Sequence, residues 1–196
     1  GDEALANHLD TLFTMPLPEE KYAHTEDITS VGIIGNYIHG NEPGHHVPYM
    51  YNYIGQPWKT ERMVRHITNE MYKATADGLC GNDDCGQMSA WYIFSALGFY
   101  PVTPGTAQYV LGSPSIEKAK IALPNGKTFE IEVKNQSPEN IYVQKVLLND
   151  KLWPRLFITH DMISDGGKLT FFMSSRPNKS RGQQFGDRPY SMSAVH

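Results

Sequence analysis

The hydrophobic pattern of the chain changes its period near Pro104, and this change limits the folds open to it. Before that point, apolar residues recur three and four positions apart, as on one face of an α-helix. After it, they alternate with polar residues in short runs separated by turn-forming pairs, as in strands joined by hairpins. The sequence therefore predicts an α+β chain in which a helical part is followed by a β part.

Residues 57–77 are predicted to form the first of two long helices. Thr60 can cap its N-terminus, and Gly78 can end it. Its apolar residues recur at helical spacing on one face: Met63, Val64, Ile67 and Met71.

Residues 86–97 are predicted to form the second helix, which ends at Gly98. Almost no polar stripe remains along it, and a helix that is apolar on all sides is normally buried. This property fits the inner layer of a helical barrel better than a helix on a surface. Two long helices cannot close a helical domain by themselves. We therefore expect this chain to be the C-terminal piece of a larger protein.

The β part is divided by three turn-forming sequences: Asn125-Gly126, Asn149-Asp150 and Asp165-Gly166-Gly167. Each lies between two alternating runs and predicts a β-hairpin. Residues 105–180 are therefore expected to form an antiparallel β-sandwich-like module. Residues 181–196 are rich in Arg, Ser and Gln and are expected to form a loose tail.

The composition excludes some classes of function. Apolar residues make up 40% of the chain and charged residues 19%, which is typical of a globular protein. The net charge of -4 argues against a nucleic-acid surface, because phosphate binding needs clustered Lys and Arg. No apolar run approaches the roughly 20 residues of a membrane span.

Asp83 and Asp84 stand directly before the second helix, in the segment GNDDCG. The free N–H groups there favour negative charge and should lower the pKa of a carboxyl group, although two adjacent carboxylates oppose each other. An ionised carboxylate suits a general base or a metal ligand, and the alternative is a helix cap. One Asp could cap while the other acts. The flanking Cys80 and Cys85 are expected to be small buried residues or a local disulfide, with a zinc site as the alternative.

The segment HGNEPGHH, residues 39–46, is the second candidate site. Asn41 and Glu42 offer the oxygen ligands that a hard cation such as calcium requires. His39 and His45 offer imidazoles, which would suit zinc. The alternative is a polar loop whose histidines satisfy buried backbone groups. Aromatic residues are dense around both segments, and one or two could stack on a sugar ring: Tyr37, Tyr49, Tyr51, Tyr53, Trp58, Trp91 and Tyr92.

Two long motifs resemble glycoside hydrolase family 92, the calcium-dependent α-mannosidases. They are HGNEPGHHVPYMYNYIGQPWKT and GLCGNDDCGQMSAWYIFSALGFYPVTPGTAQYVLGSP, and the resemblance covers residues 30–180. It implies that residues 1–104 are the C-terminal part of an (α/α)6 barrel that carries catalytic loops. It also implies exo-acting hydrolysis of α-linked mannose in glycans, with inversion at the anomeric carbon. Family habit implies a periplasmic or secreted enzyme.

The resemblance also implies roles for individual residues. The base maps to Asp84, with Asp83 as its support or the alternative, and calcium maps to Asn41 and Glu42. The substrate-binding candidates are His39, His45 and Trp58. Some family members have Asp where this chain has Asn82, so a carboxylate contribution at that position is absent here.

The family's general acid is a glutamate that is expected upstream of this chain. Glu19, Glu20 and Glu26 lie in unpatterned sequence and do not match it. We therefore expect the chain to be inactive alone and to need the N-terminal part of the same polypeptide. The alternatives are a non-catalytic carbohydrate-binding or structural β module, and a helical-barrel glycosidase for another sugar.

Overall fold

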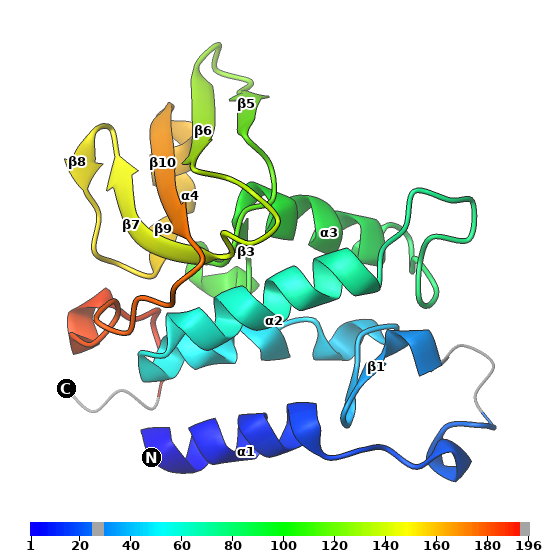
Figure 1. Cartoon of the computed structure of the whole chain (residues 1–196). Coiled ribbons are helices and arrows are strands. Elements are labelled where there is room, and N and C mark those ends of the chain that lie inside the picture. The colour runs from blue at the N-terminus through cyan, green and yellow to red at the C-terminus, as the bar shows by residue number, and fades with distance from the viewer. Residues whose placement is uncertain (25–29, 193–196) are drawn as a thin grey trace.

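The computed structural model describes residues 1–24 and 30–192 and shows a helical half beneath a β half (Figure 1). The change of hydrophobic period near Pro104 lies close to the boundary between the two halves. The first strand of the β half, β3 (Phe99–Tyr100), comes just before Pro104, directly after the last long helix. Two separate hydrophobic cores correspond to the two halves.

The helical half consists mainly of four helices: α1 (Asp2–Thr14), the 3-10 helix η4 (Val47–Ile54), α2 (Pro57–Glu70) and α3 (Gln87–Leu97). Short elements connect α1 to η4: η1 (Glu19–Lys21), η2 (Ser30–Gly32), β1 (Ile33–Ile34), β2 (Tyr37–Ile38) and η3 (Glu42–Gly44). The core between the helices is aromatic at its centre, with Trp91 and Tyr49 fully buried. The described helices do not close a ring.

Helix α2 has the predicted apolar face but different ends. Its buried residues include Met63, Val64 and Ile67, as its spacing predicts. Pro57 supplies the first turn, where its missing N–H is not needed, so Thr60 lies inside the helix and is not its cap. The helix ends at Glu70, seven residues before the predicted end at 77, and residues 71–86 form a loop.

Helix α3 matches its prediction closely, because Gly98 ends it in the left-handed conformation that glycine adopts without strain. Met88, Trp91 and Ala96 face the core. Its outer side is apolar but open to solvent in this chain, and Ile93 is 58% exposed.

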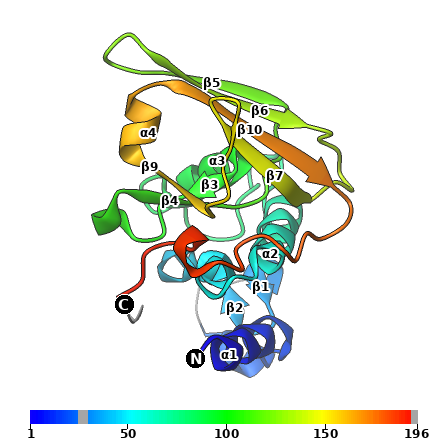
Figure 2. The same ribbon diagram turned by 90° about the vertical axis from the view of Figure 1, so that its left-hand side faces the viewer.

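The β half contains two sheets (Figure 2). The larger has the order β5-β6-β10-β7-β8, and the smaller has the order β3-β4-β9. Their strands are β4 (Gln108–Leu111), β5 (Lys118–Ala122), β6 (Thr128–Lys134), β7 (Tyr142–Leu148), β8 (Lys151–Leu152), β9 (Phe157–Thr159) and β10 (Gly167–Ser174), and η5 (Pro104–Thr106) precedes β4. The β5–β6 and β7–β8 pairs are the antiparallel hairpins predicted at Asn125-Gly126 and Asn149-Asp150.

The third predicted hairpin does not form. The run before Asp165 is strand β9 followed by a one-turn helix, α4 (His160–Ser164), which Thr159 caps through its hydroxyl. Gly166 and Gly167 have positive φ angles and lead out of this helix into β10. Strand β10 then inserts between β6 and β7, parallel to β6 and antiparallel to β7. The larger sheet is therefore mixed rather than purely antiparallel.

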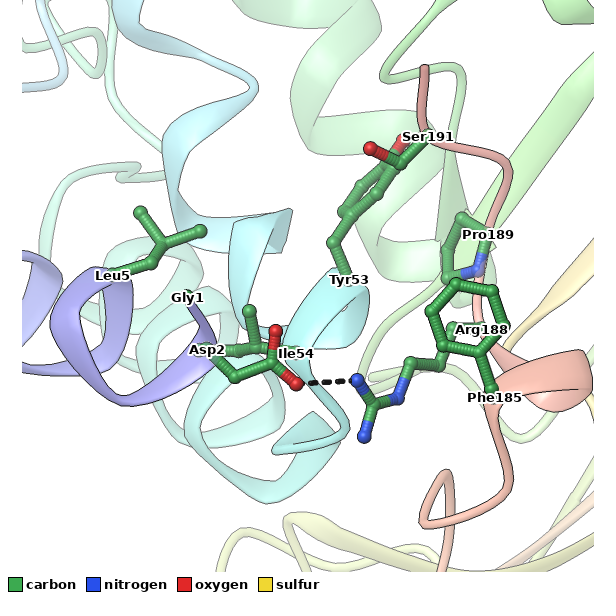
Figure 3. Close-up of a pocket in the computed structure, with 9 residues that line it drawn as sticks. All are labelled: Gly1, Asp2, Leu5, Tyr53, Ile54, Phe185, Arg188, Pro189 and Ser191. Carbon is green, nitrogen blue, oxygen red and sulfur yellow. Dashed lines mark hydrogen bonds and ion pairs between the residues drawn. The ribbon is translucent and has the colours of Figure 1, made fainter. Parts of the chain in front are cut away.

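The segment expected to be a loose tail packs against the helical half over its described residues. Arg181 is buried and pairs with Glu61 of α2 at 2.7 Å. Farther along, Arg188 pairs with Asp2 at the start of α1, on the wall of a cavity of about 340 Å³ (Figure 3). The chain thus brings its first and last elements together.

No helix in the described part of the chain is long and apolar enough to cross a membrane.

Candidate active site

The two motifs singled out in the sequence pack directly against each other through their glycines. A side chain at Gly40 would lie 2.7 Å from the carbonyl oxygen of Cys80, and one at Gly81 would collide with the backbone of Gly40. Glycine is therefore required at both positions for the backbones to approach so closely. This contact places residues 39–46 beside residues 81–87.

Asp83 accepts hydrogen bonds from the first turn of α3, three residues before the N-cap residue Gly86. Its Oδ1 accepts hydrogen bonds from the backbone N–H and the hydroxyl of Ser89, both at 2.9 Å. Its carbonyl oxygen accepts from the N–H groups of Gly86 and Met88. Asp83 therefore satisfies several donors at the start of the helix, and its side chain is committed to that task.

Asp84 is turned out of the helix by an unusual backbone. Asp84, Cys85 and Gly86 have φ angles of 46°, 58° and 99°, so three successive residues are left-handed. Each non-glycine residue in this region costs roughly 1–2 kcal/mol. Such strain is typical of functional sites, where the surrounding structure holds it in place. The turn leaves the Asp84 side chain exposed.

The Asp84 carboxyl group forms a hydrogen bond with Glu42 of the other motif. This bond, together with partial desolvation and the nearby Glu42 and Asp83 charges, raises the pKa of Asp84. The sequence predicted a lowered pKa for the acid at this helix start. That prediction is wrong for Asp84, because Asp83 takes the place at the helix end and Asp84 faces a second carboxyl group.

His39 is fully buried and both of its ring nitrogens are engaged. Nδ1 lies 2.8 Å from the hydroxyl of Tyr37, and Nε2 lies 2.7 Å from the hydroxyl of Tyr72. The Tyr72 hydroxyl donates to the carbonyl oxygen of Met88, so it accepts from His39 Nε2. Burial lowers the pKa of His39 to about 2. A neutral ring with both nitrogens bonded inside the protein orients its neighbours and has no group left for a sugar hydroxyl.

His45 is held in a similar way. Its Nε2 donates to the carbonyl oxygen of His39 at 2.9 Å, and its Nδ1 faces the side-chain amide of Gln87 at 3.2 Å. Burial lowers its pKa, although the hydrogen bond to His39 and the nearby charge of Asp84 oppose that shift. Its ring stacks on that of His39, with the centroids 4.6 Å apart. The geometry thus favours a supporting role for both histidines.

The oxygen donors in the site are of the type that a hard cation prefers, but they are too few to fill its coordination shell. Asn41 is exposed and Glu42 is half-buried beside Asp84. Two carboxyl groups joined by a hydrogen bond share a proton, which a divalent cation could replace. Within residues 1–24 and 30–192, no group of three or more His, Cys, Asp and Glu side chains could hold a metal ion. Calcium takes six to eight oxygens, so other ligands would have to join these.

Trp58 lies in a different place. It is the second residue of α2, with Lys179 Nζ 5.9 Å from its ring centroid. The loop that leads to Asp84 leaves the other end of this helix (Figure 1), about 18 Å from Trp58 along the helix axis at 1.5 Å per residue. No hydrogen bond or ring contact joins Trp58 to residues 39–46 or 81–87 in the described part of the chain, and its assignment as a substrate contact stays a prediction.

The cysteines and the N-terminal glutamates considered in the sequence lie as follows. Cys80 is buried and Cys85 is exposed, and they form no disulfide with each other. Glu19 and Glu20 are exposed in η1, and Glu26 lies outside the described residues.

Sequence reasoning missed three supporting residues. Ser89 holds Asp83, Tyr72 links His39 to α3, and Gln87 joins His45 to the Tyr100 hydroxyl. Gln87 and Ser89 fall inside the second motif, and Ser89 lies only six residues from Asp83. Tyr72 lies outside both motifs and depends on a contact between distant segments, which no local pattern reveals.

Comparison with known proteins identifies the family of the chain. Residues 1–175 match the model of the glycosyl hydrolase family 92 catalytic domain. A family GH92 α-mannosidase from Bacteroides thetaiotaomicron is 44% identical, with a TM-score of 0.89 over 99% of this chain and 24% of its own. An inverting GH92 mannosidase of the same bacterium is 39% identical, with a TM-score of 0.84 over 99% of this chain and 27% of its own.

A fungal relative from Arthroderma benhamiae, described as an uncharacterized secreted glycosidase, is 31% identical over 158 residues. That match covers 79% of this chain and 20% of the relative. The chain therefore spans about a quarter or less of the length of these proteins. Since the family model covers most of its residues, the chain belongs to glycosyl hydrolase family 92.

Proposed function

We propose that the chain is the part of a calcium-dependent, exo-acting α-mannosidase that carries the general base, Asp84. The observation that supports this most is the division of labour between the two adjacent acids. Asp83 Oδ1 accepts two hydrogen bonds from Ser89 in the first turn of α3, whereas Asp84 is exposed, held in a strained turn and directed at Glu42. A helix cap alone would need only the first of them.

A carboxylate that is ionised near neutral pH suits the role of general base. The strength of a base increases with its pKa for as long as it stays ionised at the working pH. In an inverting glycosidase, a carboxylate takes a proton from a water molecule as that water attacks the anomeric carbon. A carboxylic acid on the opposite face, about 6.5–9.5 Å away, protonates the leaving oxygen. We assign the first role to Asp84.

Calcium would be held by Glu42 and Asn41, with Asp84 next to it. Bound there, it would supply positive charge and oxygen coordination for the sugar in the same subsite. The residues of this chain provide the frame: His39 and His45 hold the Glu42 loop, and Ser89 holds the turn that presents Asp84.

The substrate class follows from relatives rather than from a pocket. The 44% identical α-mannosidase has been solved in complex with mannoimidazole. We therefore infer that the substrate is a glycan with a terminal α-linked mannose. A secreted location, outside the cell or in the periplasm, is in keeping with the fungal secreted glycosidase.

The general acid is inferred to lie outside these 196 residues. No described glutamate faces Asp84 except Glu42, which we assign to calcium. The missing acid and the remaining helices of an (α/α)6 barrel would come from the rest of a longer polypeptide. The chain alone is then expected to have no hydrolase activity.

The test compares two variants of the longer polypeptide. Asp84→Asn cannot take a proton from water, so kcat should fall by roughly 10²–10⁴-fold. Asp83→Asn is the matched control, because its amide oxygen can still accept from Ser89, and it should keep most of the turnover. Circular dichroism checks that both variants fold. Near-normal kcat for Asp84→Asn, or the larger loss for Asp83→Asn, would move the base to another residue.

A further inference from the structure

A groove of about 820 Å³ lies on the helical half between α1, α2 and residues 138–141. It shares no residue with the Asp84 site. One part of its lining is apolar and partly exposed, and it includes Ile34, Pro138 and Ile141. Another part is cationic and includes Arg62 and Arg65. The groove therefore combines the two properties that an amphipathic ligand would need.

Arg65 is the unusual residue in this lining. It is 3% exposed, and its Nη2 donates to the hydroxyl of Ser113 and to the carbonyl oxygen of Pro114. Its Nε is buried and has no hydrogen-bond partner in the described part of the chain. No carboxylate among the described residues pairs with it. A buried charge without a counter-charge is costly, and it points to a partner that supplies one.

The neighbouring charges make the same groove an attractive place for an anion. Arg62 lies one turn before Arg65 on α2, is exposed, and forms no ion pair within the described residues. His66 adds an imidazole to the same wall of the groove. Lys59 is already neutralised by Asp10 at 2.5 Å. Two arginines that form no ion pair within the described residues thus line one groove of a chain whose net charge is -4.

We propose that this groove seats an acidic, partly apolar segment of the longer polypeptide, whose carboxylate pairs with Arg62 and Arg65. The proposal rests on the proposed function, in which this chain is one portion of a larger enzyme. The 44% identical structure supports it, because this chain corresponds to 24% of that protein. A small anion would satisfy the arginines but would leave the apolar strip in water, whereas a polypeptide segment covers both.

A zero-length carbodiimide cross-linker tests the proposal, because it joins an amine to a carboxylate only at ion-pair distance. The longer polypeptide with Arg62→Lys places an amine in the groove, and Arg62→Gln is the control without one. The Lys59–Asp10 pair should cross-link in both variants and serves as the internal standard. We expect the Arg62→Lys protein alone to link position 62 to an Asp or Glu outside residues 1–196.

Several results would overturn the proposal. One is a Lys59–Asp10 link with no link from position 62 to a residue outside the chain. Another is a link from position 62 to a second copy, detected by mixing isotopically light and heavy protein. A third is an increase in Tm with inorganic phosphate that Arg62→Gln abolishes, which would mean an open site for small anions. None of these readouts measures hydrolysis, so their results are independent of the assignment of Asp84 as the base.

Discussion

Replacing Glu61 by Gln should weaken the contact that ties three parts of the chain together. Glu61 Oε1 accepts from Arg181 at 2.7 Å, and Oε2 accepts from the backbone N–H of Val143 at 3.2 Å. The contact thus joins helix α2 to strand β7 and to the C-terminal segment. A carboxylate offers an acceptor to each donor, whereas an amide offers only one oxygen. The variant must therefore lose one of the two bonds, and it leaves the Arg181 charge without a counter-charge.

The size of the effect follows from the burial of the pair. The side chains of Glu61 and Arg181 are 3% and 10% exposed, so water cannot replace the lost partner. Removing one partner of a buried ion pair costs about 3–5 kcal/mol, and since Gln keeps one bond we expect about 3 kcal/mol. For a chain of this length, 1 kcal/mol shifts Tm by roughly 2–4 °C, which gives a decrease of about 6–12 °C.

Thermal unfolding followed by circular dichroism at pH 8 measures this effect. Burial raises the pKa of Glu61 to about 7 against the opposing charge of Arg181, so the carboxylate is mostly ionised at pH 8. Glu70→Gln is the matched control, because Glu70 is an exposed residue at the end of the same helix. A Tm for Glu61→Gln as close to the wild-type value as that of Glu70→Gln would refute the reasoning.

Two further predictions concern the Asp84 site. Burial holds the pKa of His39 near 2, below its ordinary 6.5, so between these pH values only the unfolded chain takes up the proton. The contribution of His39 to the free energy of unfolding is therefore fully present above pH 6.5. It falls below that pH by up to about 1.4 kcal/mol per pH unit. In urea unfolding between pH 7.5 and 5, His39→Gln should remove this slope relative to wild type, and equal slopes would contradict a buried neutral ring. In the longer polypeptide, Glu42→Gln should raise the calcium concentration needed for half-maximal activity, whereas an unchanged calcium titration would remove Glu42 from the ligands.

Local patterns predicted much of the fold. Helix α3 was predictable because its apolar run is bounded by Gly98, and the β5–β6 and β7–β8 hairpins because their turn pairs stand between alternating runs. The insertion of β10 between β6 and β7 was not, because it depends on pairing across more than 30 residues. Local chemistry makes Asp165-Gly166-Gly167 equally suitable for a hairpin turn and for the end of a short helix.

The site was predictable in its motifs but not in its internal roles. The adjacency of Asp83 and Asp84 indicated that one could cap and the other act, but their local chemistry did not say which, and only the family resemblance favoured Asp84 as the base. The answer depends on the left-handed turn and on the contact with Glu42, which bring two distant segments together. The histidines looked like ligands because their type suits that role. Their burial commits His39 and His45 to bonds inside the protein.

The most direct test of the account is mannose release from α-linked mannobioses. The longer polypeptide and this 196-residue chain would be incubated side by side, each with and without a calcium chelator. We predict calcium-dependent release by the longer polypeptide and none by the chain alone, since the proposed function assigns Asp84 and the calcium loop to this chain and the general acid to the rest of the polypeptide. Release by the chain alone would contradict the account, because the acid would then lie within these residues. Release that the chelator leaves unchanged would contradict the assignment of calcium to Asn41 and Glu42.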